Sequence, residues 1–183
     1  MKVVFFSESG IIGKVDRTFP NARNDIAWSI MMDADWCPYG KTPTEKYDLG
    51  VVTIPKTKPN LDVDWFKQYC DKIAIMQEGP HWYFQDYSVE QQFQFVENLR
   101  KANWVWCHNK SDVSYYKGLG CKDVRVMRTL MLPEGLDCQL TTSMKNGILL
   151  GGNFTSWYSG LDSYLIAHAV NEPITNVSMG RKQ

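Results

Sequence analysis

Side chains able to do chemistry gather in the stretch IAIMQEGPHWYFQDYSVEQQ, which runs from Ile73 to Gln92. An apolar run ends there in an acid, Glu78, and Gly79-Pro80 forces the chain to turn directly afterwards. A carboxylate that follows a buried strand into a partly dry cleft can become a general base, because loss of water raises its pKa. A solvated glutamate at the end of a strand is the alternative interpretation.

Aromatic rings follow Glu78 almost at once, at Trp82, Tyr83 and Phe84. Rings of this kind stack well on the faces of sugars and bases, and three in a row are too many for a plain loop. We therefore predict that Trp82 and Tyr83, together with Asp86, contact an acceptor molecule. The alternative is that one or two of these rings pack over the helix that follows.

The histidines His81 and His108 each follow a predicted strand, whereas His168 belongs to a different element. Their positions show no metal-ligand spacing. We assign His81 to catalysis beside Glu78 and His108 to the acceptor side. A hydrogen-bonded structural histidine is the alternative for both.

Acidic triplets of the form Asp-x-Asp occur at 33–35 and at 62–64. The first is predicted to close a helix and the second to open one, and neither lies at the end of a central strand. Charge at a helix end explains both better than metal binding does. The sequence therefore predicts no metal and no cofactor.

Glycine-bearing loops follow two predicted strands. SESGIIG contains Gly10 and Gly13, and GGNFTSW begins with Gly151, Gly152 and Asn153. Glycine lets a backbone approach a phosphate closely, and a following helix can add N–H donors. Neither loop matches a dinucleotide fingerprint or a P-loop, and a turn that simply needs glycine explains each equally well.

The elements that must position these residues alternate along the chain. Short apolar runs predict strands at 2–6, 49–54, 72–77, 104–107 and 123–127. Capping residues and helical spacing predict helices at 24–32, 61–70 and 113–117, and one that Ser88 caps with Gln91 in a capping box. The run 72–77 is apolar at successive positions, which is typical of a parallel strand covered on both faces. The sequence thus predicts an α/β fold, a Rossmann-like open parallel sheet with helices on both faces.

The carboxyl ends of parallel strands meet at one edge, where ligands bind in folds of this class. This rule collects four stretches into one cleft, 7–13, 55–58, 78–87 and 108–110. We therefore expect the acid, the rings and the first glycine loop to be neighbours.

The chain divides by pattern into three parts. Residues 1–128 form the first, acceptor-side domain, 129–146 a linker, and 147–183 the start of a second Rossmann-like domain, with strands at 148–150 and 174–178 around a helix at 161–170. One such unit cannot make a domain core of its own. We expect a truncated or split enzyme, or one that a second chain completes.

This order of elements resembles the GT-B glycosyltransferases, which have two Rossmann-like domains with a cleft between them. The resemblance is greatest to phage glycosyltransferases, including phage DNA β-glucosyltransferases. Three stretches carry it. KIAIMQE is similar to the third core strand that ends in that family's catalytic aspartate, and ILLGGNFTSW and ITNVSMGRKQ are similar to strands of its nucleotide-binding domain.

The resemblance implies that Glu78 deprotonates an acceptor hydroxyl, which attacks the anomeric carbon of a nucleotide sugar. The acceptor would be a modified base in phage DNA or a glycan. This chain has glutamate where the DNA-modifying relatives have aspartate. It has Thr155 and Ser159 where they place arginines on the phosphates, which weakens stabilisation of the leaving group.

The resemblance also implies where the donor binds. Gly151, Gly152 and Asn153 would face the diphosphate, and Gly10 and Gly13 would close over it from the other side. The nucleotide sugar is a co-substrate rather than a cofactor. A nucleotide- or sugar-binding module without catalysis, and a flavodoxin-like domain, are the alternative classes.

Composition limits the partners. The 183 residues are 44% hydrophobic and 13% aromatic, enough for a real core, and twenty basic and twenty acidic residues cancel. This balance argues against a generally basic nucleic-acid binder. Five scattered cysteines suggest reduced thiols in a cytoplasm, that of the host if a phage encodes the protein. The start is too short for a signal peptide, and no run approaches the ~20 apolar residues of a membrane span.

Overall fold

The chain folds into two compact units, Met1–Asp137 and Cys138–Gln183. The structure, a computed structural model, describes residues 1–8, 10–16, 23–55, 61–77, 87–130, 132, 147–151 and 160–177. Glu78, His81, Trp82, Tyr83, Asp86, Gly152 and Asn153 lie outside these ranges. No helix within the described ranges is both long enough and apolar enough to cross a bilayer.

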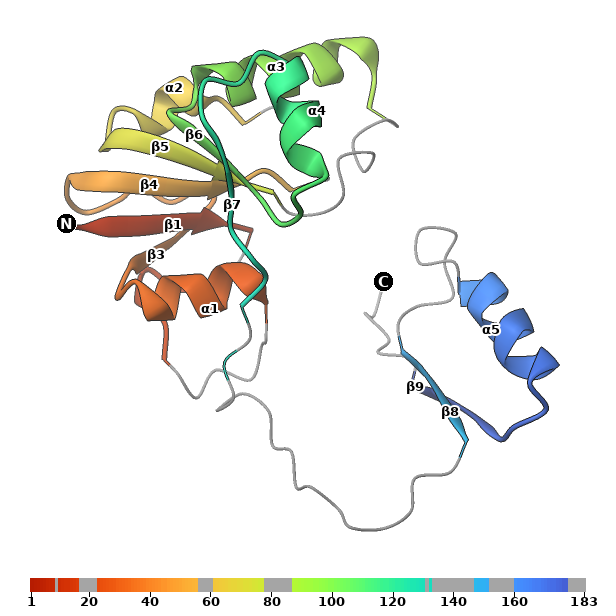
Figure 1. Ribbon diagram of the computed structural model, residues 1–183. Helices are drawn as coiled ribbons and strands as arrows, with labels where there is room; N and C mark the ends of the chain where they lie inside the picture. Colours follow the sequence, from red (N-terminus) through yellow and green to blue (C-terminus); the bar gives the residue numbers. More distant parts are fainter. Residues whose placement is uncertain are drawn as a thin grey trace. The chain divides into compact units, whose positions relative to one another are not determined.

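The first unit is built on a seven-stranded sheet in the order β2-β3-β1-β4-β5-β6-β7 (Figure 1). Its strands are β1 (Val3–Ser7), β2 (Gly13–Lys14), β3 (Asp35–Pro38), β4 (Tyr47–Thr53), β5 (Cys70–Met76), β6 (Trp104–Cys107) and β7 (Val124–Val126). Neighbouring strands are parallel, except that β2 runs antiparallel to β3. The α/β class and the mostly parallel sheet are as predicted.

Helices cover both faces of this sheet (Figure 1). The helix α1 (Asn24–Met31) packs Ile26 with Phe5, Val51 and Met76 on one face. On the other face, α2 (Val63–Phe66), α3 (Val89–Lys101) and α4 (Asp112–Gly118) contribute buried side chains, among them Phe66, Phe95 and Tyr116. β5 lies between two parallel partners with Ile73 to Met76 buried, which confirms the inference from its continuous apolar run.

The direction in which the chain crosses the sheet changes once. From β1 it passes through α1 to β3 on one side, and from β4 it proceeds through α2, α3 and α4 to β7 on the other. Right-handed crossovers require helices of these two sets to lie on opposite faces. The change of direction falls between β1 and β4, which makes their carboxyl ends the topological switch point where open α/β sheets bind ligands.

Of two helix predictions made from the sequence, one is confirmed in its cap and the other is wrong in its length. The capping box at Ser88 and Gln91 is confirmed, with the side chain of each accepting a hydrogen bond from the backbone N–H of the other. The helix predicted at 61–70 is wrong in length, because α2 ends at Phe66 and a turn leads into β5.

The strand β3 and the edge strand β2 beside it were not predicted. The first Asp-x-Asp triplet was assigned to the end of a helix, but α1 ends at Met31, and Asp35 is the first residue of β3. Asp33 sits in the turn between them with a positive φ of 48°. The second triplet does open a helix, since Asp62 caps α2 by accepting from the N–H of Asp64.

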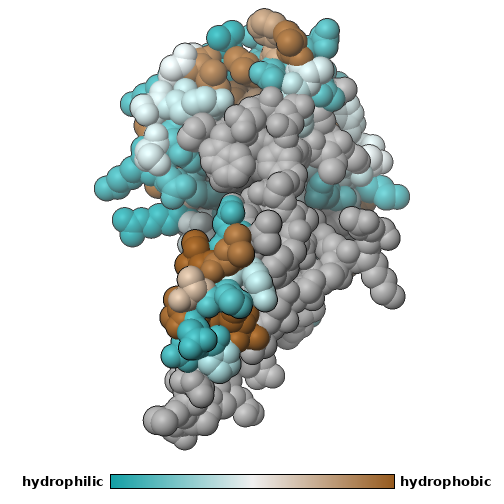
Figure 2. All heavy atoms as spheres, turned by 90° about the vertical axis from the view of Figure 1, so that its right-hand side faces the viewer, coloured by the Kyte–Doolittle hydropathy of each residue, from teal (hydrophilic) through white to brown (hydrophobic). Residues whose placement is uncertain are grey.

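The second unit contains a parallel pair of strands, β8 (Ile148–Gly151) and β9 (Ile174–Val177), with α5 (Gly160–Ala169) between them in the chain. Each end of these three elements lies within one residue of its predicted position. Along α5, Ala167 is buried, whereas Tyr164, Leu165 and Ile166 are exposed. Figure 2 shows apolar and polar side chains side by side on this helix.

Candidate functional site at the carboxyl edge of the sheet

Polar side chains line the carboxyl edge of the seven-stranded sheet. β1 ends in Ser7, β4 ends in Thr53, and Gln77 and His108 directly follow β5 and β6. Ser7, Thr53 and Gln77 are each at most 5% exposed. Buried polar groups need partners, so their hydrogen bonds define what this edge can do.

The Ser7 cluster consists of Ser7, Arg23 and Asp25. The Ser7 hydroxyl donates to Asp25 Oδ2 at 2.8 Å and accepts from Arg23 Nη2 at 3.0 Å. The guanidinium also binds both oxygens of Asp25, through Nη2 at 2.7 Å and Nε at 3.1 Å. The Asp25 carboxylate is 5% exposed, and this two-point pairing fixes the start of α1 against the end of β1.

The Gln77 cluster consists of Gln77, His108 and Asp112. The Gln77 amide nitrogen donates to Asp112 Oδ2 at 2.8 Å, and its oxygen accepts from the backbone N–H of His108 at 3.0 Å. The backbone N–H of Gln77 donates to the carbonyl of Trp106 at 2.8 Å. Gln77 is therefore anchored at three points to β6 and to the first residue of α4.

Asn24 joins the two clusters. Its amide nitrogen lies 3.4 Å from each ring nitrogen of His108, and its amide oxygen accepts from the backbone N–H of Leu130 at 2.8 Å. The His108 Nδ1 lies 3.1 Å from the carbonyl of Met127. A carbonyl only accepts, so Nδ1 is the donor in this contact.

Thr53 has a buried hydroxyl without a partner among the described residues. In the sheet register Phe6 pairs with Val52 and Thr53 pairs with Met76. Because side chains alternate between faces, the Thr53 hydroxyl points to the α1 face, beside Ser7. An unpaired donor at the switch point is costly, by roughly 1–3 kcal/mol, and marks this spot as built for more than packing.

The predicted glycines Gly10 and Gly13 both need the conformation that glycine allows. Their φ angles are +120° and +114°. A Cβ on Gly10 would lie 2.5 Å from Nε1 of the Trp36 indole, whereas a Cβ on Gly13 would meet nothing within 4 Å. Gly10 thus permits a close approach to Trp36, and Gly13 pairs with the same residue across β2 and β3. These contacts explain both glycines structurally and leave the donor-binding prediction untested.

The remaining predicted site residues are distributed over the two units. His108 lies at the carboxyl edge, half-buried and held by Met127. Gly151 ends β8 in the second unit, paired in register with Val177.

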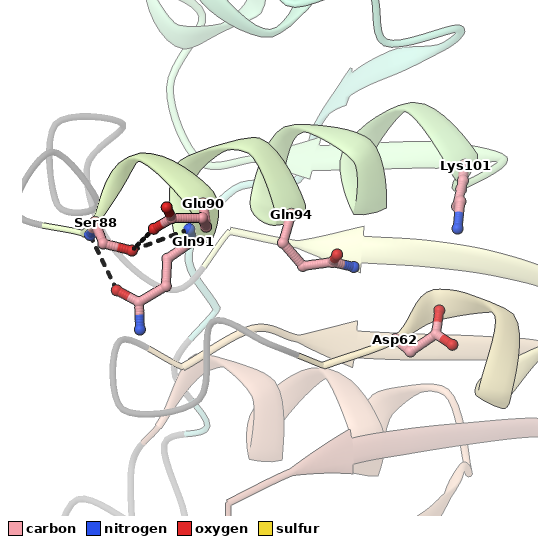
Figure 3. A pocket seen from close by; sticks show the side chains of 6 residues that line it. All are labelled: Asp62, Ser88, Glu90, Gln91, Gln94 and Lys101. Carbon is pink, nitrogen blue, oxygen red and sulfur yellow. Dashed lines mark hydrogen bonds between the residues drawn. The ribbon is translucent and has the colours of Figure 1, made fainter.

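A hollow lies elsewhere, between the start of α2 and one side of α3 (Figure 3). It measures about 800 Å³, and its lining side chains already have partners. Ser88 donates to Glu90, Gln94 donates to Asn98, and Lys101 pairs with Asp64. A groove whose polar groups serve the two helices is a solvated surface rather than a reactive site.

No group of three potential metal ligands occurs in the described part of the chain. Its four cysteines are free and buried, at positions 37, 70, 107 and 121. Burial raises the pKa of Cys70 to about 12 and that of Cys121 to about 11. Thiols of this kind are inert at neutral pH, so nucleophilic cysteine chemistry is not supported at these positions.

The Ser7 cluster and Thr53 were not predicted from the sequence. Asp25 was assigned to the first turn of a helix, where it does lie, but its binding to Ser7 and Arg23 joins residues from two elements. The available signal was the placement of small hydroxyl residues at the ends of two apolar strands.

Comparisons with family models, with curated proteins and with solved structures find no match to this chain. The case for function therefore rests on the residues of the carboxyl edge and on the resemblance described above.

Proposed function

We propose that this protein is a glycosyltransferase of the GT-B type, which transfers a sugar from a nucleotide sugar to an acceptor hydroxyl. The open parallel sheet supports this proposal, with its polar carboxyl edge and a switch point between β1 and β4. The second unit adds support, because its first strand, β8, ends at Gly151 in a parallel pair.

The anchoring of Gln77 carries the proposal. Asp112, His108 and Trp106 each hold one polar group of this residue. Glu78 is the residue that follows Gln77 in the sequence. A general base needs such a rigid support, because small displacements cost much of the rate.

In the proposed reaction Glu78 takes the proton of the acceptor hydroxyl. The oxygen forms a bond to the anomeric carbon of the donor, and the bond from that carbon to the diphosphate breaks. The electron pair leaves with the nucleoside diphosphate. His81 assists in this proton transfer, and Gly10, Gly13, Gly151, Gly152 and Asn153 bind the donor.

Trp82, Tyr83, Asp86 and His108 are proposed to bind the acceptor, a modified base in DNA or a glycan. The tautomer of His108 suits this role. With Nδ1 donating to the carbonyl of Met127, Nε2 faces the Asn24 amide nitrogen at 3.4 Å, and an acceptor hydroxyl would replace that amide as the donor to Nε2.

The test measures release of nucleoside diphosphate by the 183-residue protein, alone and together with the chain that completes its second domain. UDP-glucose, UDP-galactose and GDP-mannose are each offered with hydroxymethylated DNA or with oligosaccharides. We expect turnover with one pair, and Glu78→Gln should lower it by about 10²–10⁴-fold while donor binding persists. Glu97→Gln, a substitution of an exposed helical glutamate, is the control.

Calorimetry with the same donors separates the alternatives. Donor binding without turnover would favour a nucleotide-sugar-binding module. Neither binding nor turnover, or full turnover in Glu78→Gln, would remove the transferase proposal.

A further inference from the structure

A second hollow, of about 520 Å³, opens beside β1 on the face opposite to α1. Its lining includes Phe6, Tyr39, Lys41, Leu61, Asp62 and Trp65. None of these residues belongs to the Ser7 cluster or the Gln77 cluster. The volume lies within the range of small-molecule sites, roughly 300–1,000 Å³.

The topology explains why this hollow exists. β3 and β4 are parallel to β1 and lie on either side of it, so the chain must cross over β1 between them. Such crossings usually contain a helix. Here residues 39–46 cross without one, and part of the β1 face therefore stays open between this segment and α2.

Fixed aromatic rings form the apolar side of the hollow. The Trp65 ring meets Phe6 at 6.2 Å and Phe66 at 5.0 Å, both edge to face. The Tyr39 hydroxyl donates to the carbonyl of Phe6 at 3.0 Å, and it also contacts the carbonyl of Thr53. Trp65 and Tyr39 are only half-buried, so these locked rings retain accessible surface.

Two opposite charges stand on the rim of the hollow. Asp62 uses Oδ1 to cap α2, through the N–H of Asp64 at 3.0 Å, and its charge also acts on the Lys101 ammonium. The Lys41 ammonium has no partner within the described ranges, and it forms no ion pair with Asp62 there. The hollow thus offers a carboxylate that accepts hydrogen bonds and an ammonium that donates them.

We propose that this hollow binds a pyranose sugar, with a C–H face of the ring on Trp65 and its hydroxyls on Asp62 and Lys41. A pyranose presents one apolar face and a rim of hydroxyls that both donate and accept. It therefore contacts the aromatic rings and the two charged side chains of the hollow at the same time. A nucleobase also stacks on a ring and carries donors and acceptors on its edge, so nucleosides are the competing ligand class that the test must exclude. The site shares no residue with Glu78 or the donor loops, so it stands independently of the transferase proposal.

The test titrates the 183-residue protein with methyl glucoside, methyl galactoside, methyl mannoside and methyl N-acetylglucosaminide. Saturation-transfer NMR reports binding and identifies the bound face, and adenosine and cytidine are run in parallel. We expect at least one glycoside to bind saturably, with the strongest transfer to C–H protons of one ring face.

Variants then locate the site. Asp62→Asn keeps the helix cap, because asparagine caps as well as aspartate, and should weaken binding about tenfold. Lys41→Met keeps the alkyl stem and should also weaken it. Asp71→Asn, on exposed β5 surface, is the matched control and should leave binding unchanged. Trp65→Phe retains a ring in the wall and guards against loss of folding.

Three outcomes would overturn the proposal. These are no saturable glycoside binding, equal binding by the wild type, Asp62→Asn and Lys41→Met, or binding of nucleosides in place of glycosides. Glu78→Gln should bind the glycoside as the wild type does. Failure of transfer and failure of this site are therefore distinguishable.

Discussion

Asn24, in the first turn of α1, accepts a hydrogen bond of 2.8 Å from the backbone N–H of Leu130, 106 residues further along the chain. In the same segment, the backbone carbonyl of Arg128 accepts a hydrogen bond of 3.1 Å from the indole N–H of Trp28. The chain that leaves β7 is thus tied back to the first helix of the unit, across the carboxyl edge of the sheet.

Replacement of Asn24 should loosen this tie. We expect Asn24→Ala to lower the free energy of unfolding by about 1–2 kcal/mol, because the Leu130 N–H loses its acceptor. Urea denaturation measures the change, and the Leu130 amide should exchange its hydrogen faster. Asn109→Ala, at an exposed position, should change neither quantity.

Replacement of Asp25 should unbalance the Ser7 cluster. Asp25→Asn leaves the Arg23 guanidinium without its carboxylate, and we expect a loss of about 3 kcal/mol. In the double variant with Arg23→Met much of this loss should be recovered. Asp33→Asn, whose side chain is 93% exposed, provides the control. A loss equal to that of the control would mean that the pair does not hold α1.

A substitution at Thr53 is expected to leave the stability of the fold unchanged or to raise it. Thr53→Val removes the unpaired hydroxyl at nearly constant volume, so we expect stability to be unchanged or raised by about 1 kcal/mol. Thr44→Val, at an exposed position, serves for comparison. A clear destabilisation would instead show that the hydroxyl has a partner, such as bound water, in solution.

The two glycines of the first loop should respond differently to alanine. Gly13→Ala meets only backbone strain, at φ +114°, and should cost about 1 kcal/mol. Gly10→Ala adds a clash with the Trp36 indole and should cost more. Thermal unfolding of both variants tests the order. Gly118→Ala, in open space at the end of α4, should be neutral or slightly stabilising.

Stability in acid should depend on Asp64. Hydrogen bonds from Lys101 and Lys67 lower the pKa of this carboxyl from 3.8 to about 2. A lowered pKa means that the ionised group stabilises the fold above about pH 4, and that this contribution is lost as the pH falls towards 2. Urea midpoints of the wild type and Asp64→Asn should therefore differ above pH 4 and converge below it. Added salt should reduce the difference, and Asp71→Asn should show none.

Much of the architecture could be predicted because local signals agree with it. The strand at 104–107 and the capping box of α3 are local features, and the continuous apolar run of β5 reports burial on both faces. The strand β3 was not predicted, because four residues that follow a helix give too short a pattern to be distinguished from the last turn of that helix. Strand order was not predictable either, since it depends on crossover handedness and packing between distant segments.

The candidate site shows the same division. The rule for parallel sheets led to the edge where β1 ends in Ser7 and where His108 follows β6. The contacts of Asp25 with Ser7, and of Gln77 with Asp112, join residues 18 and 35 positions apart. No periodicity or motif encodes such pairs, because they arise only when strands and helices have been placed.

The outermost strands of the sheet are its shortest, with two residues in β2 and three in β7. Within β2, Lys14 forms ion pairs with Asp33 and Asp35. Short edge strands that carry charged side chains offer few unpaired backbone N–H and C=O groups to which a strand of another molecule could bind. These short edge strands therefore protect the sheet from aggregation by edge-to-edge pairing. The protection comes from the strands whose sequence pattern is the weakest.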